Sequence, residues 1–199
     1  MNLSGIFPTP IGTSEFNEPF PAALIDKIYQ FDIQKNFGNK RSVRADVLSD
    51  PVFERISVFI DNAVSEYFHK VYRPKELITP YVTQSWISYT SPGQYHHKHV
   101  HGNSFISGVF YIQTNAHDSI CFHDDTYKSL NITTEHFNVF NSDTMYFPVR
   151  EGMLLLFPSS TPHSVDIIGD DTIDRISLAF NTFVRGNIGS KDRLTELIL

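Results

Sequence analysis

The chain has 199 residues and a mass of 22.8 kDa, enough for one domain with a substantial core and marginal for two. Its composition, 41% hydrophobic and 19% charged, is typical of a globular domain and argues against intrinsic disorder. The 16 basic and 22 acidic residues give a net charge of −6. This acidic balance lacks the electrostatic footprint of a nucleic-acid-binding protein.

The location of the protein is predicted from what its sequence lacks. The single cysteine, Cys121, cannot form an internal disulfide, so nothing indicates an oxidising compartment. The N-terminus has no basic segment followed by a long apolar one, and no apolar run approaches the roughly 20 residues that cross a bilayer. We expect a soluble cytoplasmic protein with no membrane partner. The sequence leaves a homodimer open.

Residues 1–80 are predicted to be mainly helical. Pro21 followed by Leu24 and Ile28 has the spacing of a short helix. A longer helix begins at Asp50-Pro51, an N-cap followed by a proline at the first helical position, and Pro74 indicates its end. Its apolar stripe consists of Phe53, Ile56, Ile60, Ala63 and Tyr67.

A small basic cluster lies between these two helices. It consists of Lys35, Lys40, Arg41 and Arg44. We interpret it as a solvated loop, with contact to an anionic substrate as the alternative.

The chain changes character at Tyr81. From there, segments rich in β-branched and aromatic residues alternate with glycine, proline, asparagine and aspartate. Strands are predicted near 82–89, 97–101, 104–112, 119–123, 145–149, 153–157, 163–167 and 175–183. Short strands without helices between them indicate a sandwich or barrel rather than alternating α/β units. The predicted class is α+β, mainly β, with the helices packed outside one sheet.

Histidine is the unusual residue type, with nine in the chain. His99 and His101 lie two apart on a predicted strand, so their side chains point to the same face. His163 follows the apolar strand near 153–157 after a short turn. Two ligands from one strand and a third from a distant strand predict a metal site, although imidazole ligands suit Fe, Zn, Cu and Ni alike. His97 shares the face of His99 and could replace either neighbour.

The last predicted strand has one apolar and one polar face. Arg175, Ser177, Ala179 and Asn181 alternate with core residues, so they share the polar face. An interior lined by such residues is costly unless it binds a ligand. Arginine offers a planar fork to a carboxylate, with the serine as a donor beside it. A solvated strand edge is the alternative.

These residues together resemble the 2-oxoglutarate- and Fe(II)-dependent oxygenases, in particular a subfamily of marine bacteria and their phages. That subfamily shows H-x-H-x-x-S-x-x-S-G-V-x-Y, found here from His99 to Tyr111. Further on it shows G-x-L-x-x-F-P-S, here Gly152 to Ser159, before a distal histidine, and then R-I-S-x-x-F-N, here from Arg175. The resemblance covers nearly the whole chain, and its central motif is the specific one.

The resemblance implies a double-stranded β-helix, also called a jelly roll or cupin-like fold. It implies one domain over 1–199, with a helical part over 1–80 and a jelly-roll core over 81–185. It also implies a dioxygenase that uses Fe(II), 2-oxoglutarate and O₂, hydroxylates its substrate and releases succinate and CO₂. The substrate itself, a small molecule or a peptide, is not identified.

The resemblance also assigns roles to residues. His99 matches the first iron ligand and His163 the distal one. Arg175 stands where the superfamily grips the 5-carboxylate of 2-oxoglutarate, with Ser177 as its usual partner. Tyr89, Tyr111 and Asn181 are further candidates for binding this cosubstrate, and no general base beyond the metal ligands is expected.

The departure from the family pattern is at His101, where the superfamily has Asp or Glu. Three neutral imidazoles leave Fe(II) with two positive charges instead of one, which changes its potential. A carboxylate from elsewhere, such as Asp124 or Asp125, is an alternative third ligand. The other hypothesis for the whole protein is a cupin-like metal-binding module or non-oxidative metalloenzyme, which would use the same histidines for Zn or Ni.

Overall fold

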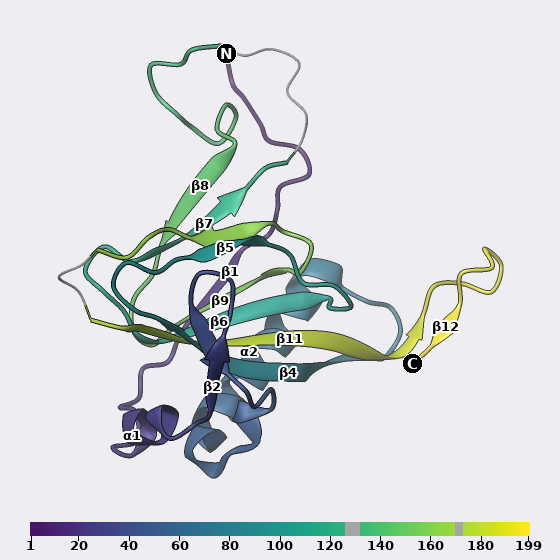
Figure 1. Ribbon diagram of the computed structural model, residues 1–199. Coiled ribbons are helices and arrows are strands. Elements are labelled where there is room, and N and C mark those ends of the chain that lie inside the picture. Colours follow the sequence, from purple (N-terminus) through teal and green to yellow (C-terminus); the bar gives the residue numbers. More distant parts are fainter. Residues whose placement is uncertain (126–131, 170–172) are drawn as a thin grey trace.

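The computed structural model describes residues 1–125, 132–169 and 173–199, which form two antiparallel sheets with helices on one side (Figure 1). The helices are α1 (Leu24–Tyr29), α2 (Glu54–Tyr72) and the 3₁₀ turns η1 (Val47–Ser49) and η2 (Pro51–Phe53). The strands are β1 (Gly12–Glu15), β2 (Ile33–Lys35), β3 (Lys40–Ser42), β4 (Ile78–Thr90), β5 (His96–His99), β6 (Ile106–Gln113), β7 (Ser119–His123), β8 (Thr144–Pro148), β9 (Met153–Pro158), β10 (His163–Val165), β11 (Arg175–Ile188) and β12 (Leu197–Ile198).

The larger sheet has the order β1-β9-β6-β11-β4-β3-β2, with β12 paired to the end of β11. Its centre is the long antiparallel pair of β4 and β11, in which Arg175 lies opposite Thr90 and Ser177 opposite Ser88. Alternation then puts the polar residues of β11 on one face of this sheet and its apolar residues on the other.

The smaller sheet has the order β5-β10-β7-β8. Between β5 and β10 the register shifts: His99 pairs with His163, but His96 pairs with Val165. Strand β5 therefore holds one more residue than β10 between these pairs, which is a β-bulge. The bulge lies inside the histidine-rich segment.

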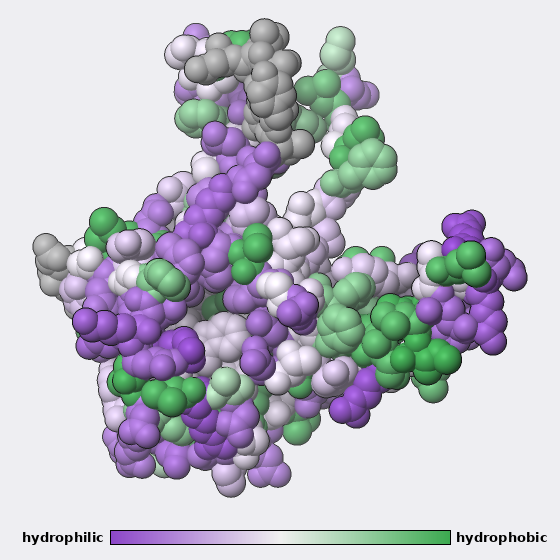
Figure 2. All heavy atoms as spheres, turned by 45° about the vertical axis from the view of Figure 1, so that its right-hand side comes forward, coloured by the Kyte–Doolittle hydropathy of each residue, from purple (hydrophilic) through white to green (hydrophobic). Residues whose placement is uncertain are grey.

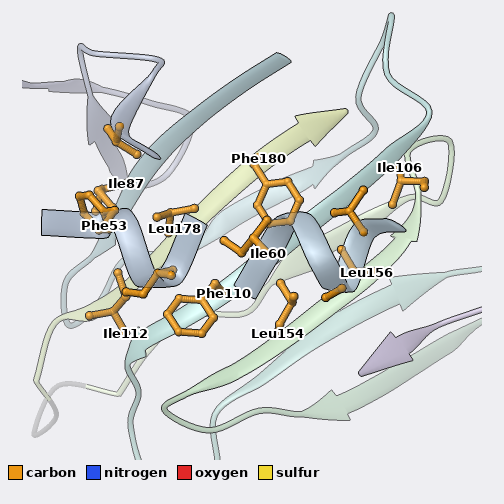
Figure 3. Close-up of a cluster of buried hydrophobic side chains, with 14 of the residues drawn as sticks. Phe53, Ile60, Ile87, Ile106, Phe110, Ile112, Leu154, Leu156, Leu178 and Phe180 are labelled. Atoms are coloured by element: carbon orange, nitrogen blue, oxygen red, sulfur yellow. The ribbon is translucent and has the colours of Figure 1, made fainter. Parts of the chain in front are cut away.

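Helix α2 covers the apolar face of the larger sheet. The carboxylate of Asp50 accepts a hydrogen bond from the Val52 backbone N–H at 3.2 Å, which caps the entry to this helix. The helix ends at Arg73, which adopts the left-handed conformation with φ of 43°. Figure 3 shows Ile60 of α2 among Phe110, Leu178 and Phe180 of the sheet, and all four side chains are buried.

A second apolar cluster fills the space between the two sheets. Leu155 and Phe157 of β9, Tyr111 of β6 and Ile120 and Phe122 of β7 belong to it. Each sheet thus presents one face to this interior, and the larger sheet presents its other face to the helices. All eight strands predicted after Tyr81 are present, β7 with the predicted bounds and the others with shifted ends, and both predicted helices are present too.

The N-terminal part differs from its prediction as a helical region. It also contributes β1, β2 and β3 to the larger sheet. The basic cluster is not a loop: Lys35 and Lys40 pair across the β2–β3 hairpin, and Arg41 of β3 lies opposite Ser88 of β4. Arg44 follows the hairpin and forms ion pairs with Asp46 and Asp50. The sequence missed this hairpin because its strands are only three residues long and highly polar.

The end of β11 and β12 form an arm that projects from the body (Figure 1). Figure 2 shows hydrophobic side chains gathered beside the hydrophilic tip of this arm. Among the described residues, no helix is both long and apolar enough to span a membrane.

Candidate metal centre

Three histidines predicted as metal ligands lie together between the sheets. Each of His99, His101 and His163 offers a nitrogen, and these atoms all lie within 4.8 Å of one another. The ring centroids of His99 and His163 are 4.3 Å apart, and those of His101 and His163 are 5.2 Å apart. His99 of β5 and His163 of β10 are 64 residues apart in the sequence. They come together because they are direct cross-strand partners.

Backbone carbonyls orient two of these rings. The Nδ1 of His99 lies 2.7 Å from the carbonyl oxygen of His97, and the Nδ1 of His163 lies 3.0 Å from that of Thr161. A carbonyl only accepts, so each Nδ1 carries the proton and donates it. This leaves each Nε2 as the metal-binding nitrogen.

Burial keeps the three imidazoles neutral. It lowers the pKa of His163 to about 3 and the pKa of His101 to about 4. The pKa of His99 is also lowered, again mainly by burial. Neutral imidazole is the form that binds a metal, so the three side chains are ready as ligands at pH 7.

His101 lies just after β5 rather than on it. Its backbone N–H donates to the carbonyl oxygen of Ser159 at 3.0 Å. The Ser159 hydroxyl lies 2.7 Å from that of Ser104 and 2.8 Å from that of Ser107. This serine network links the segment after His101 to β6 and to the end of β9. It therefore holds His101 in place without regular strand pairing.

Arg175 faces the histidines from the larger sheet, across a cavity that both line. Ser177 and Ala179 of β11 and Trp86 and Ser88 of β4 line the same wall. The side chain of Arg175 is only 3% exposed, which excludes a solvated strand edge. The polar face of the last strand is thus interior, as predicted.

Arg175 has a charged partner within the protein, Asp118. Its Nε donates to the two carboxylate oxygens of Asp118 at 3.0 and 2.8 Å, and the Asp118 side chain is 6% exposed. Nη1 lies 3.5 Å from the Ser177 hydroxyl, at the limit for a hydrogen bond. Asp118 therefore stabilises the buried charge through one edge of the guanidinium and leaves the outer edge available.

Two buried polar atoms, one on Arg175 at the cavity wall and one on the buried residue packed against it, have no hydrogen-bond partner among the described residues. They are Nη2 of Arg175 and the hydroxyl oxygen of Tyr111. The Cζ of Arg175 lies 5.0 Å from the centroid of the Tyr111 ring. Burial raises the pKa of Tyr111, so the phenol keeps its proton and can donate. An orphaned pair of donors beside a cation fits an anionic group such as a carboxylate.

Two other predicted residues are not brought to the cavity. The Tyr89 hydroxyl donates to the carbonyl oxygen of Ile28 at 2.6 Å, inside the core beneath the helices, because alternation along β4 turns it away from Ser88. The side-chain oxygen of Asn181 accepts from the Ser107 hydroxyl at 2.9 Å, so this amide joins the serine network.

The alternative carboxylate ligands also lie outside both metal-capable groups of the described residues. The carboxylate of Asp125 pairs with Lys98 and is 57% exposed. Asp124 stands beside it, with its backbone N–H donating to the carbonyl of Asp143.

The sequence missed His96, which lines the cavity, and Asp118, which pairs with Arg175 behind it. Strict alternation from His99 puts His96 on the opposite face, and only the bulge in β5 turns it toward the cavity. Burial and neighbouring histidines lower the pKa of His96 to about 2. Asp118 precedes β7 without a motif, so no sequence signal pointed to it.

Comparison with protein families finds a match over residues 84–181 to the family described as "Putative 2OG-Fe(II) oxygenase". No curated protein matches.

Solved structures give the fold. HygX from Streptomyces hygroscopicus, with nickel and 2-oxoglutarate bound, has a TM-score of 0.60 and 14% identity over 87% of this chain and 82% of that one. A prolyl-4-hydroxylase from Pseudomonas putida has a TM-score of 0.57 and 13% identity over 87% and 92%. A 2OG-Fe(II) oxygenase family oxidoreductase from Burkholderia pseudomallei has 0.55 and 11% over 80% and 76%. These likenesses confirm the predicted double-stranded β-helix.

Proposed function

Because the chain belongs, through residues 84–181, to the 2OG-Fe(II) oxygenase family, we propose that His99, His101 and His163 hold its iron and that it hydroxylates a small molecule or peptide. Membership of this family makes the protein an oxidoreductase that uses Fe(II) and 2-oxoglutarate. The observation that carries this proposal is the pairing of a three-histidine cluster with unsatisfied donors on Arg175 and Tyr111 in one interior. In a core that binds no ligand, these buried donors would stay unsatisfied at a cost in stability.

The donor set fits Fe(II). Three imidazoles that stay neutral at pH 7 bind a divalent ion through their Nε2 or equivalent nitrogens and leave further positions open. When bound, Fe(II) with 2-oxoglutarate and O₂ supplies the oxidation, in which one oxygen atom enters the substrate and succinate and CO₂ are released. The carbonyls of His97 and Thr161 hold the ligand rings in orientation.

The cosubstrate is anchored by the larger sheet. Arg175 offers Nη1 and Nη2 to a carboxylate, Tyr111 donates its hydroxyl, and Ser177 lies beside them. A ligand set of three neutral imidazoles and no carboxylate leaves the two positive charges of the metal uncompensated. These charges match the two negative charges of 2-oxoglutarate. The chain itself moves no proton in this scheme; it binds, orients and excludes water.

We also propose that 1–199 act as one domain. Strands β1 to β3 of the N-terminal part complete the same sheet that carries Arg175 and Ser177. The hairpin of β2 and β3 pairs directly with β4, which lines the cavity.

The test is calorimetry of 2-oxoglutarate into the anaerobic Fe(II)-loaded protein, followed by an assay of succinate release in air. We expect one Fe(II) per chain, binding of 2-oxoglutarate that requires Fe(II), and succinate formation. His99→Ala and His163→Ala each lose stoichiometric Fe(II), whereas His69→Ala, an exposed histidine of α2, keeps it.

The alternative is a metal-binding module or non-oxidative metalloenzyme, which the absence of a carboxylate among the three ligands favours. In that case the same histidines bind Zn or Ni, and an acid held by Arg175 is not consumed. Binding of 2-oxoglutarate without any succinate release would overturn the oxygenase proposal in favour of this one.

A further inference from the structure

Two metal-capable groups of histidines overlap in the described residues. Besides the group of His99, His101 and His163, the nitrogens of His96, His97 and His99 also lie within 4.8 Å of one another. We call the first group the inner triad and the second the outer triad. His99 belongs to both.

The bulge in β5 creates the outer triad. In a regular strand His96 and His97 would point to opposite faces. The extra residue between the His96–Val165 and His99–His163 pairs removes that alternation. The ring centroids of His96 and His97 consequently lie 4.3 and 4.9 Å from that of His99.

An unsatisfied atom indicates that the outer triad is built to bind something. The Nδ1 of His97 is buried and has no hydrogen-bond partner among the described residues. The Phe37 ring packs 4.9 Å from the His97 ring, so an apolar neighbour shields it. A metal ion would satisfy this nitrogen.

The shared histidine can serve only one ion at a time. The Nδ1 of His99 donates to the His97 carbonyl, which leaves Nε2 as its single free nitrogen. One imidazole nitrogen binds one ion, so the two triads exclude each other.

We propose that His96, His97 and His99 form a second divalent-cation site that takes Zn²⁺ and that competes with the inner triad for His99. Three neutral imidazoles with a water in the fourth position are a common set of ligands for zinc. Nitrogen sites also bind Zn²⁺ more tightly than Fe²⁺. Zinc at the outer triad removes His99 from the inner triad and thereby blocks iron loading. The site depends on its own residues, whatever reaction the inner triad supports.

His96 has one further neighbour that the site must accommodate. The side-chain nitrogen of Asn36 lies 3.3 Å from Nε2 of His96. The amide nitrogen only donates, so Nε2 accepts and the ring proton is on Nδ1. Binding of the ion through Nε2 therefore requires the Asn36 amide to release this nitrogen.

The experiment measures Zn²⁺ binding to the full chain after the inner triad has been removed. His101→Ala/His163→Ala should still bind one Zn²⁺ per chain, measured by calorimetry and by metal content after gel filtration. His101→Gln/His163→Gln serves as a second variant, because glutamine keeps polar bulk if alanine compromises folding. Circular dichroism melts establish which variant is folded.

Adding His96→Ala/His97→Ala to the folded variant should abolish this stoichiometric binding. The matched control adds His69→Ala/His136→Ala instead, two exposed histidines, and should retain the ion. The wild-type chain should saturate at one Zn²⁺.

Three results would overturn the proposal: no Zn²⁺ in the variant that lacks the inner triad, unchanged binding after loss of His96 and His97, or two ions bound per wild-type chain. Failure here leaves Fe(II) and 2-oxoglutarate binding by the wild-type protein untouched, so the two proposals are tested separately.

Discussion

The residue that most distinguishes this site is His101, because it stands where a carboxylate is expected. An imidazole leaves the ion with one more positive charge than a carboxylate would. Its ring packs 5.8 Å from that of Trp86 and 5.2 Å from that of His163. Its backbone is held independently by Ser159, so the side chain can change without loss of the loop.

His101→Asp should therefore keep Fe(II) binding while changing cosubstrate affinity. The added negative charge lowers the net charge at the metal, so we expect weaker binding of the 2-oxoglutarate dianion at low ionic strength. Calorimetry at two salt concentrations measures this effect, with the neutral His101→Asn as control. Complete loss of iron from His101→Asp would show that this side chain is not a ligand.

Arg175 and Asp118 form the second residue-scale feature, a buried ion pair with one free edge. Removing only the arginine leaves a buried carboxylate without its partner, which typically costs about 3–5 kcal/mol of stability. A single substitution therefore confuses folding with binding.

The double variant Arg175→Leu/Asp118→Leu separates the two effects. Replacing both charges by apolar groups should restore most of the stability lost in Arg175→Leu, as urea denaturation would measure. Binding of 2-oxoglutarate should stay weakened by about 2–5 kcal/mol, the usual loss for one partner of a buried charged pair. Wild-type affinity in the double variant would remove Arg175 from the cosubstrate site.

At the scale of elements, the sequence predicted what is periodic and missed what breaks the period. The apolar stripe from Phe53 to Tyr67 and the alternation in β11 were sufficient for α2 and for the interior position of Arg175. The bulge in β5 and the short hairpin of β2 and β3 were not predictable, since both depend on pairing with distant strands. The same limit explains why His96 was missed. Tyr89 was misplaced for a different reason, because alternation along β4 puts it on the face opposite Ser88.

Pairing of β6 with β11 gives a sharp test of packing. Gly108 lies opposite Phe180, and a Cβ at position 108 would overlap the Phe180 ring. Gly108→Ala should destabilise the protein by about 1–3 kcal/mol, the usual cost of overpacking a core. Urea denaturation measures it, with Gly102→Ala, which meets nothing within 4 Å, as the matched control. Equal stability of the two variants would contradict this packing.

For Gly108, a compensating change checks the cause. Phe180→Leu in the Gly108→Ala background removes part of the ring that the new methyl group would meet. If overlap with the ring is the cause, the double variant should lose less free energy of unfolding than the two single variants lose when their losses are added.

At the scale of the whole molecule, each of the two sheets contributes a different part of the site. The smaller sheet carries His99 and His163, and the larger sheet carries Arg175 and Tyr111. His101 lies on the segment that connects them. The cavity thus depends on the two sheets being held together, and that closure buries several histidines in neutral form.

This burial makes the stability of the metal-free protein depend on pH. His101 and His163 have pKa values lowered to about 4 and about 3, whereas an unfolded histidine titrates near 6.5. Below pH 6.5 the unfolded chain therefore binds protons that the folded chain does not. The free energy of unfolding consequently decreases as the pH is lowered. Each such histidine changes the free energy of unfolding by at most about 1.4 kcal/mol per pH unit between pH 6 and 4.5. Urea denaturation of the metal-free protein across this range measures the slope. His163→Gln should reduce the slope by about one proton, and His69→Gln on the exposed face of α2 should leave it unchanged. A slope that is the same in wild type and His163→Gln would mean that this imidazole does not remain neutral in the folded state.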